Sequence, residues 1–66
     1  MKLTINGESL EIARALNIRG LLEHLDLEPR KVAVERNLEI VPKSLYADTA
    51  LCDGDRIEIV HFVGGG

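Results

Sequence analysis

Apolar side chains stand at every second position near the start of the chain. This alternation runs through residues 2–6 and returns in residues 9–12, as in strands with one buried face. Asn6-Gly7 lies between the two runs, and both residues tolerate the positive φ that a type I′ turn requires. We therefore expect the chain to open as a β-hairpin.

After the hairpin, the spacing changes to that of a helix. Four apolar residues fall at i, i+3, i+4 and i+7, on one helical face: Ile18, Leu21, Leu22 and Leu25. Asn17 is a favoured N-cap residue type, and Arg19 and Glu23 are spaced to pair on the other face. Because Pro29 cannot continue a helix, we expect the helix to end by about Leu27.

Extended segments dominate the second half of the chain. Residues 32–34 predict a buried strand, and Arg36-Asn37 predicts a turn into a short extended piece at 39–41, which Pro42 halts. Residues 43–51 are expected to form a connection with a short helical turn near Leu45 and Tyr46.

The chain's last predicted strand is its longest. Asp53-Gly54-Asp55 supplies a turn signal, and residues 56–63 follow with five apolar side chains. These elements predict an α+β fold with one helix packed on a sheet of four or five strands. We expect one α+β domain over residues 1–63 and a flexible glycine tail at 64–66.

Composition narrows the class of protein. Sixty-six residues, 45% hydrophobic and 29% charged, suit one small globular domain. The net charge of −3 argues against a nucleic-acid partner, and no apolar run approaches the roughly 20 residues that cross a bilayer. Because the single cysteine cannot form an internal disulfide, we expect a reducing compartment, by default the cytoplasm.

Gly64-Gly65-Gly66 breaks the pattern directly after the most apolar strand. Glycines add no side chain to the core, so this run contributes nothing to the fold. A backbone without side chains can thread a narrow channel in another protein, with the Gly66 carboxylate as its reactive group. Such a carboxylate needs a leaving group, which an ATP-derived acyl-adenylate provides. The alternative is a frayed end or a cloning remnant.

Four segments together resemble the thiamine-biosynthesis sulfur carrier family. They read V-A-V-E-R-N at 32–37, I-V-P at 40–42, L-C-D-G-D-R-I-E-I-V at 51–60 and V-G-G-G at 63–66. The resemblance as a whole extends over nearly the entire chain. The resemblance implies a ubiquitin-like β-grasp fold, a mixed sheet of four or five strands on one helix. It places the first and last strands side by side in the middle of the sheet.

The resemblance also implies a mechanism. An E1-like adenylyltransferase would use ATP to adenylate the Gly66 carboxylate, and a cysteine-derived sulfur relay would convert it to a thiocarboxylate. Thiazole synthase would receive the sulfur. Gly65 would be the motif partner of Gly66, and Gly64 a spacer. The chain would be a carrier and a substrate of enzymes, with no catalytic side chain, metal or bound cofactor of its own.

Val60 and Phe62 are expected on the strand face opposite Ile57 and Ile59. With Val63 they would form an apolar surface that docks on partner enzymes. The alternative is a fully packed strand, or a bulge that turns Phe62 inward.

The other reactive residue types are given structural roles. His24 and His61 have no partner acid or nucleophile, so we expect packing or surface positions. Cys52 follows Leu51 in an apolar setting and is expected to be a small core residue. Six charged residues are expected on a solvated surface, with steering of a basic partner as the alternative. They are Glu35, Arg36, Glu39, Asp53, Asp55 and Glu58.

Three other functions stay open at this point. The chain could carry sulfur for molybdopterin or another product, or be a ubiquitin-like modifier conjugated to lysines. It could also be an interaction module with an inert tail. An independent enzyme is disfavoured, since the sequence has no nucleophile–base pair or phosphate-binding glycine loop. A monomer is the expected state, because a carrier presents its tail to two partners in turn.

Overall fold

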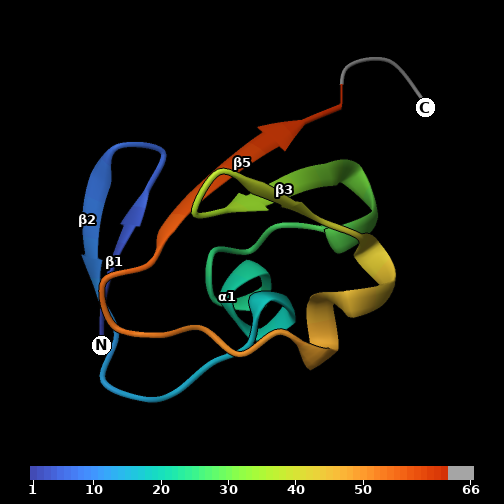
Figure 1. Ribbon diagram of the computed structural model, residues 1–66. Helices are drawn as coiled ribbons and strands as arrows, with labels where there is room; N and C mark the ends of the chain where they lie inside the picture. The colour runs from blue at the N-terminus through green and yellow to red at the C-terminus, as the bar shows by residue number, and fades with distance from the viewer. Residues whose placement is uncertain (63–66) are drawn as a thin grey trace.

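A single five-stranded sheet organises the chain in the computed structural model, which describes residues 1–62 (Figure 1). Its strands follow one another in the order β2-β1-β5-β3-β4. Their bounds are Lys2–Ile5 for β1, Glu8–Glu11 for β2, Val32–Arg36 for β3, Glu39–Val41 for β4 and Arg56–His61 for β5.

The opening hairpin is confirmed. β1 and β2 are antiparallel, with Ile5 opposite Glu8 across the turn. Asn6 and Gly7 have φ values of 49° and 84°, the left-handed conformation that a type I′ turn needs. The β3–β4 turn is also left-handed, with Asn37 at 51° and Leu38 at 73°.

The helix begins where its cap predicts. α1 spans Ile18–His24, and the Asn17 side chain accepts a hydrogen bond of 2.7 Å from the Gly20 N–H. The expected Arg19–Glu23 ion pair is present at 3.6 Å. The helix ends three residues before Leu27, because Leu25 leaves helical geometry at ψ 2° and Asp26 takes a φ of 61°.

β5 lies at the centre of the sheet. It pairs in parallel with β1, with Ile5 opposite Ile57, and antiparallel with β3, from Val32 opposite His61 to Arg36 opposite Ile57. The first and last strands are therefore neighbours in the middle of the sheet, as expected. Met1 and the end of β5 lie at opposite ends of the molecule (Figure 1).

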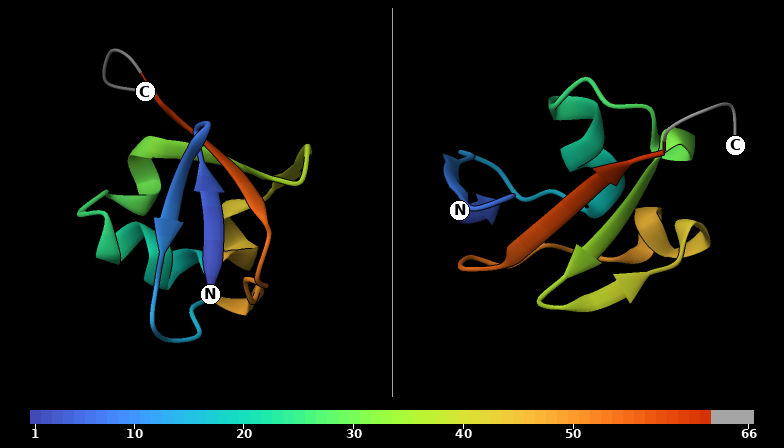
Figure 2. Two further views of the ribbon diagram at one scale, coloured as in Figure 1. Left: turned by 90° about the vertical axis from the view of Figure 1, so that its left-hand side faces the viewer. Right: turned by 90° about the horizontal axis from the view of Figure 1, so that it is seen from above.

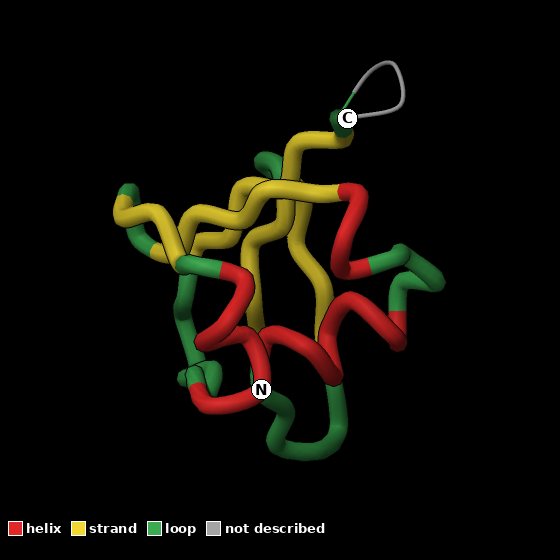
Figure 3. Tube along the Cα trace, turned by 90° about the vertical axis from the view of Figure 1, so that its right-hand side faces the viewer, coloured by secondary structure: helices red, strands yellow, loops and turns green. Residues whose placement is uncertain are grey.

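The helical segments gather on one side of the sheet (Figures 2 and 3). They are α1 and two 3₁₀ segments, η1 at Pro29–Lys31 and η2 at Lys43–Asp48; η2 is the turn expected near Tyr46, and η1 was not expected. Between them and the sheet lies the core: Leu3, Ile12, Ile18, Leu21, Leu22, Val32, Val34, Tyr46, Leu51, Ile57 and Ile59. The predicted α+β class is confirmed.

The last strand is shorter than predicted. β5 ends at His61, whereas the sequence pattern extended it to Val63. Phe62 still donates its backbone N–H to the Lys31 carbonyl at 3.0 Å, but Lys31 belongs to η1, so no strand continues opposite it. Val63 and the predicted tail at 64–66 lie outside the described residues.

Candidate functional site

The candidate site is the end of β5, where the chain runs toward the glycine motif. β5 hydrogen-bonds to β3 as far as His61, and the Phe62 N–H bonds to η1. The backbone is thus held by the sheet as far as His61 and by η1 at Phe62, the last described residue. Four predicted site residues lie outside the described part of the chain: Val63, Gly64, Gly65 and Gly66.

Val60 and Phe62 both present apolar surface to solvent. Their exposed fractions are 62% and 51%, whereas Ile57 is fully buried and Ile59 is 7% exposed. The expected alternation is confirmed, and no bulge turns Phe62 inward. Two large apolar side chains therefore stand outside the core, beside the point where the described chain ends.

Lys43 is a neighbour of this site that the sequence pattern did not indicate. Its Nζ lies 4.3 Å from the centroid of the Phe62 ring, in cation–π geometry. Pro42 ends β4, and Lys43 begins η2. The contact therefore joins η2 to the end of β5, and only the tertiary fold brings the two together.

Two further exposed apolar residues were also missed. Leu38 is 86% exposed in the β3–β4 turn, and Ile40 is 77% exposed on β4. Ile40 pairs with Glu35, and Val60 pairs with Ala33. Glu35 and Ala33 alternate with the buried residues of β3, so Ile40 and Val60 project from the sheet face turned away from α1. The sequence contained a signal for Ile40: neighbouring residues of a strand face opposite sides, so Ile40 and Val41 could not both be buried on the same face.

An open groove of about 900 Å³ lies between α1, η1 and η2. Its walls mix opposite charges, including Arg19, Glu23, Glu28 and Arg30. Leu27, Pro29 and Tyr46 contribute apolar surface to the same walls.

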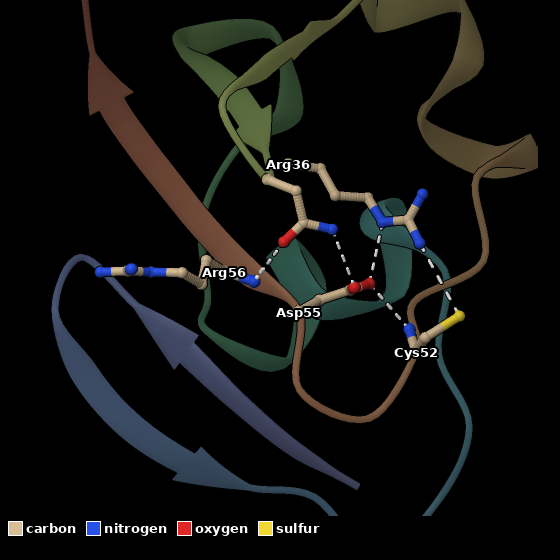
Figure 4. A network of polar contacts seen from close by, with 5 residues as sticks. Arg36, Cys52, Asp55 and Arg56 are labelled. Atoms are coloured by element: carbon tan, nitrogen blue, oxygen red, sulfur yellow. Dashed lines mark hydrogen bonds and ion pairs between the residues drawn. The ribbon is translucent and has the colours of Figure 1, made fainter.

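Asp55 corrects an expectation from the sequence. It was placed on a solvated surface, but it is 6% exposed and anchors the polar network of Figure 4. Its carboxylate accepts hydrogen bonds from Arg36 Nε at 2.8 Å, from the Cys52 N–H at 2.8 Å and from Asn37 Nδ2 at 3.0 Å. These contacts tie the turn before β5 to the end of β3.

The network sets the protonation of Asp55. Burial acts to raise the pKa of its carboxyl, but the hydrogen bonds from Arg36, Cys52 and Asn37 and the Arg36 charge outweigh it. The pKa of Asp55 therefore lies below its ordinary value. The same hydrogen bond to Asp55 raises the pKa of Arg36.

Cys52 is exposed, not a core residue as the sequence suggested. Leu51 takes the buried position, and Cys52 points the other way, where its Sγ accepts a contact from Arg36 Nη2 at 3.7 Å. In a loop, neighbouring residues need not share an environment, so the apolar neighbour was a poor guide.

His24 and His61 are both exposed, in line with the surface role given to them. Among residues 1–62, no group of three His, Cys, Asp or Glu side chains could hold a metal ion. None of the helices formed by these residues is long and apolar enough to span a membrane.

Comparisons with known proteins agree with this architecture. The ThiS family matches residues 3–66. The crystal structure of the thiamine biosynthesis protein (ThiS) from Geobacter metallireducens superposes with a TM-score of 0.86 at 36% identity, covering 100% of both chains. The β-grasp fold expected from the resemblance is confirmed by this likeness and by the five-stranded mixed sheet.

Some relatives of the chain are about as long as the chain itself, and others are about five times as long. The sulfur carrier protein ThiS of Bacillus subtilis is 48% identical over 65 residues, which cover 97% of this chain and 98% of that protein. The thiazole synthase of Paramagnetospirillum magneticum is 58% identical over all 66 residues, yet the chain spans only 20% of its length. A second thiazole synthase, from Magnetococcus marinus, is 44% identical, and the chain again spans 20% of it.

Proposed function

The chain belongs to the ThiS family, and on that premise we propose that it is a sulfur carrier for the thiazole of thiamine. The observation that carries the proposal is the family match over residues 3–66, which includes the whole glycine motif. The near full-length similarity to the Bacillus subtilis sulfur carrier supports it.

The reacting group in this proposal is the carboxyl group of Gly66. An E1-like adenylyltransferase joins one of its oxygens to the α-phosphorus of ATP, and pyrophosphate leaves. A hydrosulfide equivalent supplied by a cysteine-derived relay then attacks the carbonyl carbon, the carbon–oxygen bond to AMP breaks, and AMP leaves. The product is a thiocarboxylate, a good nucleophile at sulfur. Gly65 and Gly64 contribute a backbone narrow enough to enter the active sites of both partner enzymes.

The chain itself is then a substrate, with no bound cofactor, and ATP is consumed by the activating enzyme. Thiazole synthase is the proposed acceptor, and the two relatives with that name support this choice because they contain a domain similar to the entire chain. We propose that the chain is a monomer, because the tail must be free for each partner in turn. We also place it in the cytoplasm, because its single cysteine fits a reducing compartment.

Docking in this proposal uses the exposed apolar side chains of Val60 and Phe62, together with Val63, the next residue in the sequence. Burying them on a partner removes apolar surface from water next to the reacting segment. The same surface can serve both partners because they bind the carrier at different times.

Intact-protein mass spectrometry tests the proposal. The chain is incubated with the E1-like enzyme, ATP and a sulfur source, and a mass gain equal to replacing one oxygen by sulfur is expected. Fragmentation should place the gain on Gly66, and deletion of Gly66 should abolish it. Isopeptide adducts on lysines without a thiocarboxylate would instead support a protein modifier. Sulfur loading followed by transfer only to another acceptor would exclude thiazole synthase.

A further inference from the structure

Phe62, the last described residue, is held from two sides. Its backbone N–H donates to the Lys31 carbonyl of η1 at 3.0 Å. Its ring faces the ammonium group of Lys43 in η2, with Nζ 4.3 Å from the ring centroid. A cation within about 6 Å of a ring centroid is attracted by the negative face of the ring. The backbone and the side chain of Phe62 are therefore fixed by two different elements.

The register of the sheet explains how η2 reaches the end of β5. β4 and β5 both pair antiparallel with β3, so they run in the same direction, and Val34 lies opposite both Val41 and Ile59. Lys43 comes two residues after Val41. Phe62 comes three residues after Ile59, at the same end of the sheet. The two strands lie two strand spacings apart, about 10 Å, and the lysine and phenylalanine side chains together span this distance.

The Lys43 ammonium has no acidic partner within residues 1–62. The basic groups that form ion pairs in this part of the chain are the N-terminus, Arg19, Arg30 and Arg36. Lys43 is exposed and the Phe62 ring is 51% exposed, so their contact lies outside the core. The contact therefore acts on the end of β5, which it fixes in the free protein.

Four residues connect this fixed point to the reacting group. Residues 63–66 span at most about 14 Å, at about 3.3–3.6 Å per residue. Three of them are glycines, the residue type that loses most backbone freedom on ordering. An enzyme that acts on the Gly66 carboxyl must order this segment, and each further residue that it orders adds to the entropy cost of binding. Because Phe62 is already fixed in the free protein, it adds nothing to that cost.

We propose that Lys43 is a positioning residue for the adenylation of Gly66, because its ammonium group holds the Phe62 ring and so fixes the point at which the reacting segment begins. The inference rests on the proposed function. Lys43 orders Phe62 before the enzyme binds, and the ring stays ordered in the transition state. The contact therefore favours binding of the carrier and leaves the chemical step unchanged.

Lys43→Gln and Lys43→Arg test the inference in ATP–pyrophosphate exchange with the adenylating enzyme, at saturating ATP and varied carrier concentration. An exposed cation–π contact shifts an equilibrium about two- to fivefold, so Lys43→Gln should raise the KM for the carrier by that factor with kcat unchanged. Lys43→Arg keeps a cation over the ring and should keep the parent KM. Lys2→Gln makes the same charge change on β1, at the opposite end of the molecule, and is the matched control. All variants are assayed at a temperature where circular dichroism shows them folded.

Phe62→Leu separates an effect through the ring from a direct contact of Lys43 with the enzyme. If Lys43 acts through the ring, adding Lys43→Gln to Phe62→Leu leaves the KM of that variant unchanged. NMR of the free protein reports the contact itself, because the aromatic ring shifts the methylene protons of Lys43 upfield. This shift should be present in the parent and lost in Phe62→Leu.

Four results would overturn the inference: a parent-like KM in Lys43→Gln, an equal rise in Lys43→Arg or Lys2→Gln, a fall in kcat, or a further rise in the double variant. Exchange by the unaltered chain tests the proposed function separately. A parent chain that is never adenylated loses the function and the inference together. A parent chain that is adenylated no better than Lys43→Gln keeps the function and loses only the role of Lys43.

Discussion

The Asn6 side chain takes the place of a strand residue beside Ile59. Its Oδ1 accepts the Ile59 N–H at 2.7 Å, and its Nδ2 donates to the Ile59 carbonyl at 3.1 Å. β1 ends at Ile5, so the amide satisfies backbone groups of β5 that the strand itself no longer reaches. The turn residue of the hairpin is thereby also a support for the central strand.

Asn6→Gly should destabilise the fold through these lost bonds. Glycine accepts the φ of 49° without strain, so the loss combines the missing side-chain bonds with the larger chain entropy of glycine in the unfolded state. The free energy of unfolding should fall by about 1–3 kcal/mol, the cost of leaving backbone groups of Ile59 without their partners. Urea unfolding at neutral pH measures it, and a change under about 0.5 kcal/mol would show that water replaces the amide.

Asp55→Asn should remove an acid-sensitive part of the stability. Because the folded pKa of Asp55 lies below the ordinary 3.8, its contribution is present above pH 3.8. It is lost as the pH falls through the lower folded value. At neutral pH the free energy of unfolding of the variant should be about 2–4 kcal/mol lower than that of the parent, because Arg36 loses its carboxylate partner.

Thermal unfolding of the parent and of Asp55→Asn between pH 7 and pH 2 checks this sign. The difference in stability between the two should shrink as the pH falls. Asp48→Asn, which alters an exposed carboxylate in η2, is the control and should leave the profile unchanged. A gap that stays constant with pH would contradict the depressed pKa.

Phe62→Asp should abolish adenylation of the tail while leaving the fold intact. Phe62 is 51% exposed, so the core does not depend on its ring, but the proposed docking surface does. Pyrophosphate release measures adenylation, and circular dichroism shows whether the variant is folded. Phe62→Leu keeps apolar surface at the same point and should retain most activity. Equal activity of the Asp and Leu variants would remove Phe62 from the docking surface.

Cys52→Ser should leave sulfur loading of Gly66 unchanged. Cys52 lies in the turn before β5, where its exposed thiol contacts Arg36. The proposed reaction uses Gly66, which follows the other end of β5 in the sequence. The comparison is the mass gain of parent and variant under identical loading conditions. Loss of loading in a folded variant would give Cys52 a part in the sulfur transfer.

Local sequence signals identified most of the elements. Asn6-Gly7 set the hairpin, Asn17 the start of α1 and Pro42 the end of β4. Each acts on its own neighbours through φ, hydrogen bonding or a missing N–H, so it can be recognised without knowing the fold. The exposure of Val60 and Phe62 followed in the same way from alternation along one strand.

The errors came where contacts join distant segments. Asp55 looked like any turn carboxylate, yet it is buried because Arg36 at the end of β3 and Asn37 in the β3–β4 turn both bond to it. Lys43 gave no signal of its contact with Phe62, and β5 stopped early because η1, not a strand, lies opposite Phe62.

The sequence by itself determined the five strands and α1, their buried faces and the glycine motif, because periodicity and turn residues act over a few positions. The pairing of β5 with β1 was expected from the family resemblance, whereas tertiary structure alone decided that β5 pairs with β3, that Glu35 meets Glu58 and that Asp55 is enclosed. Those outcomes depend on strand register, and register follows from packing the whole core at once. A local pattern does not contain that information.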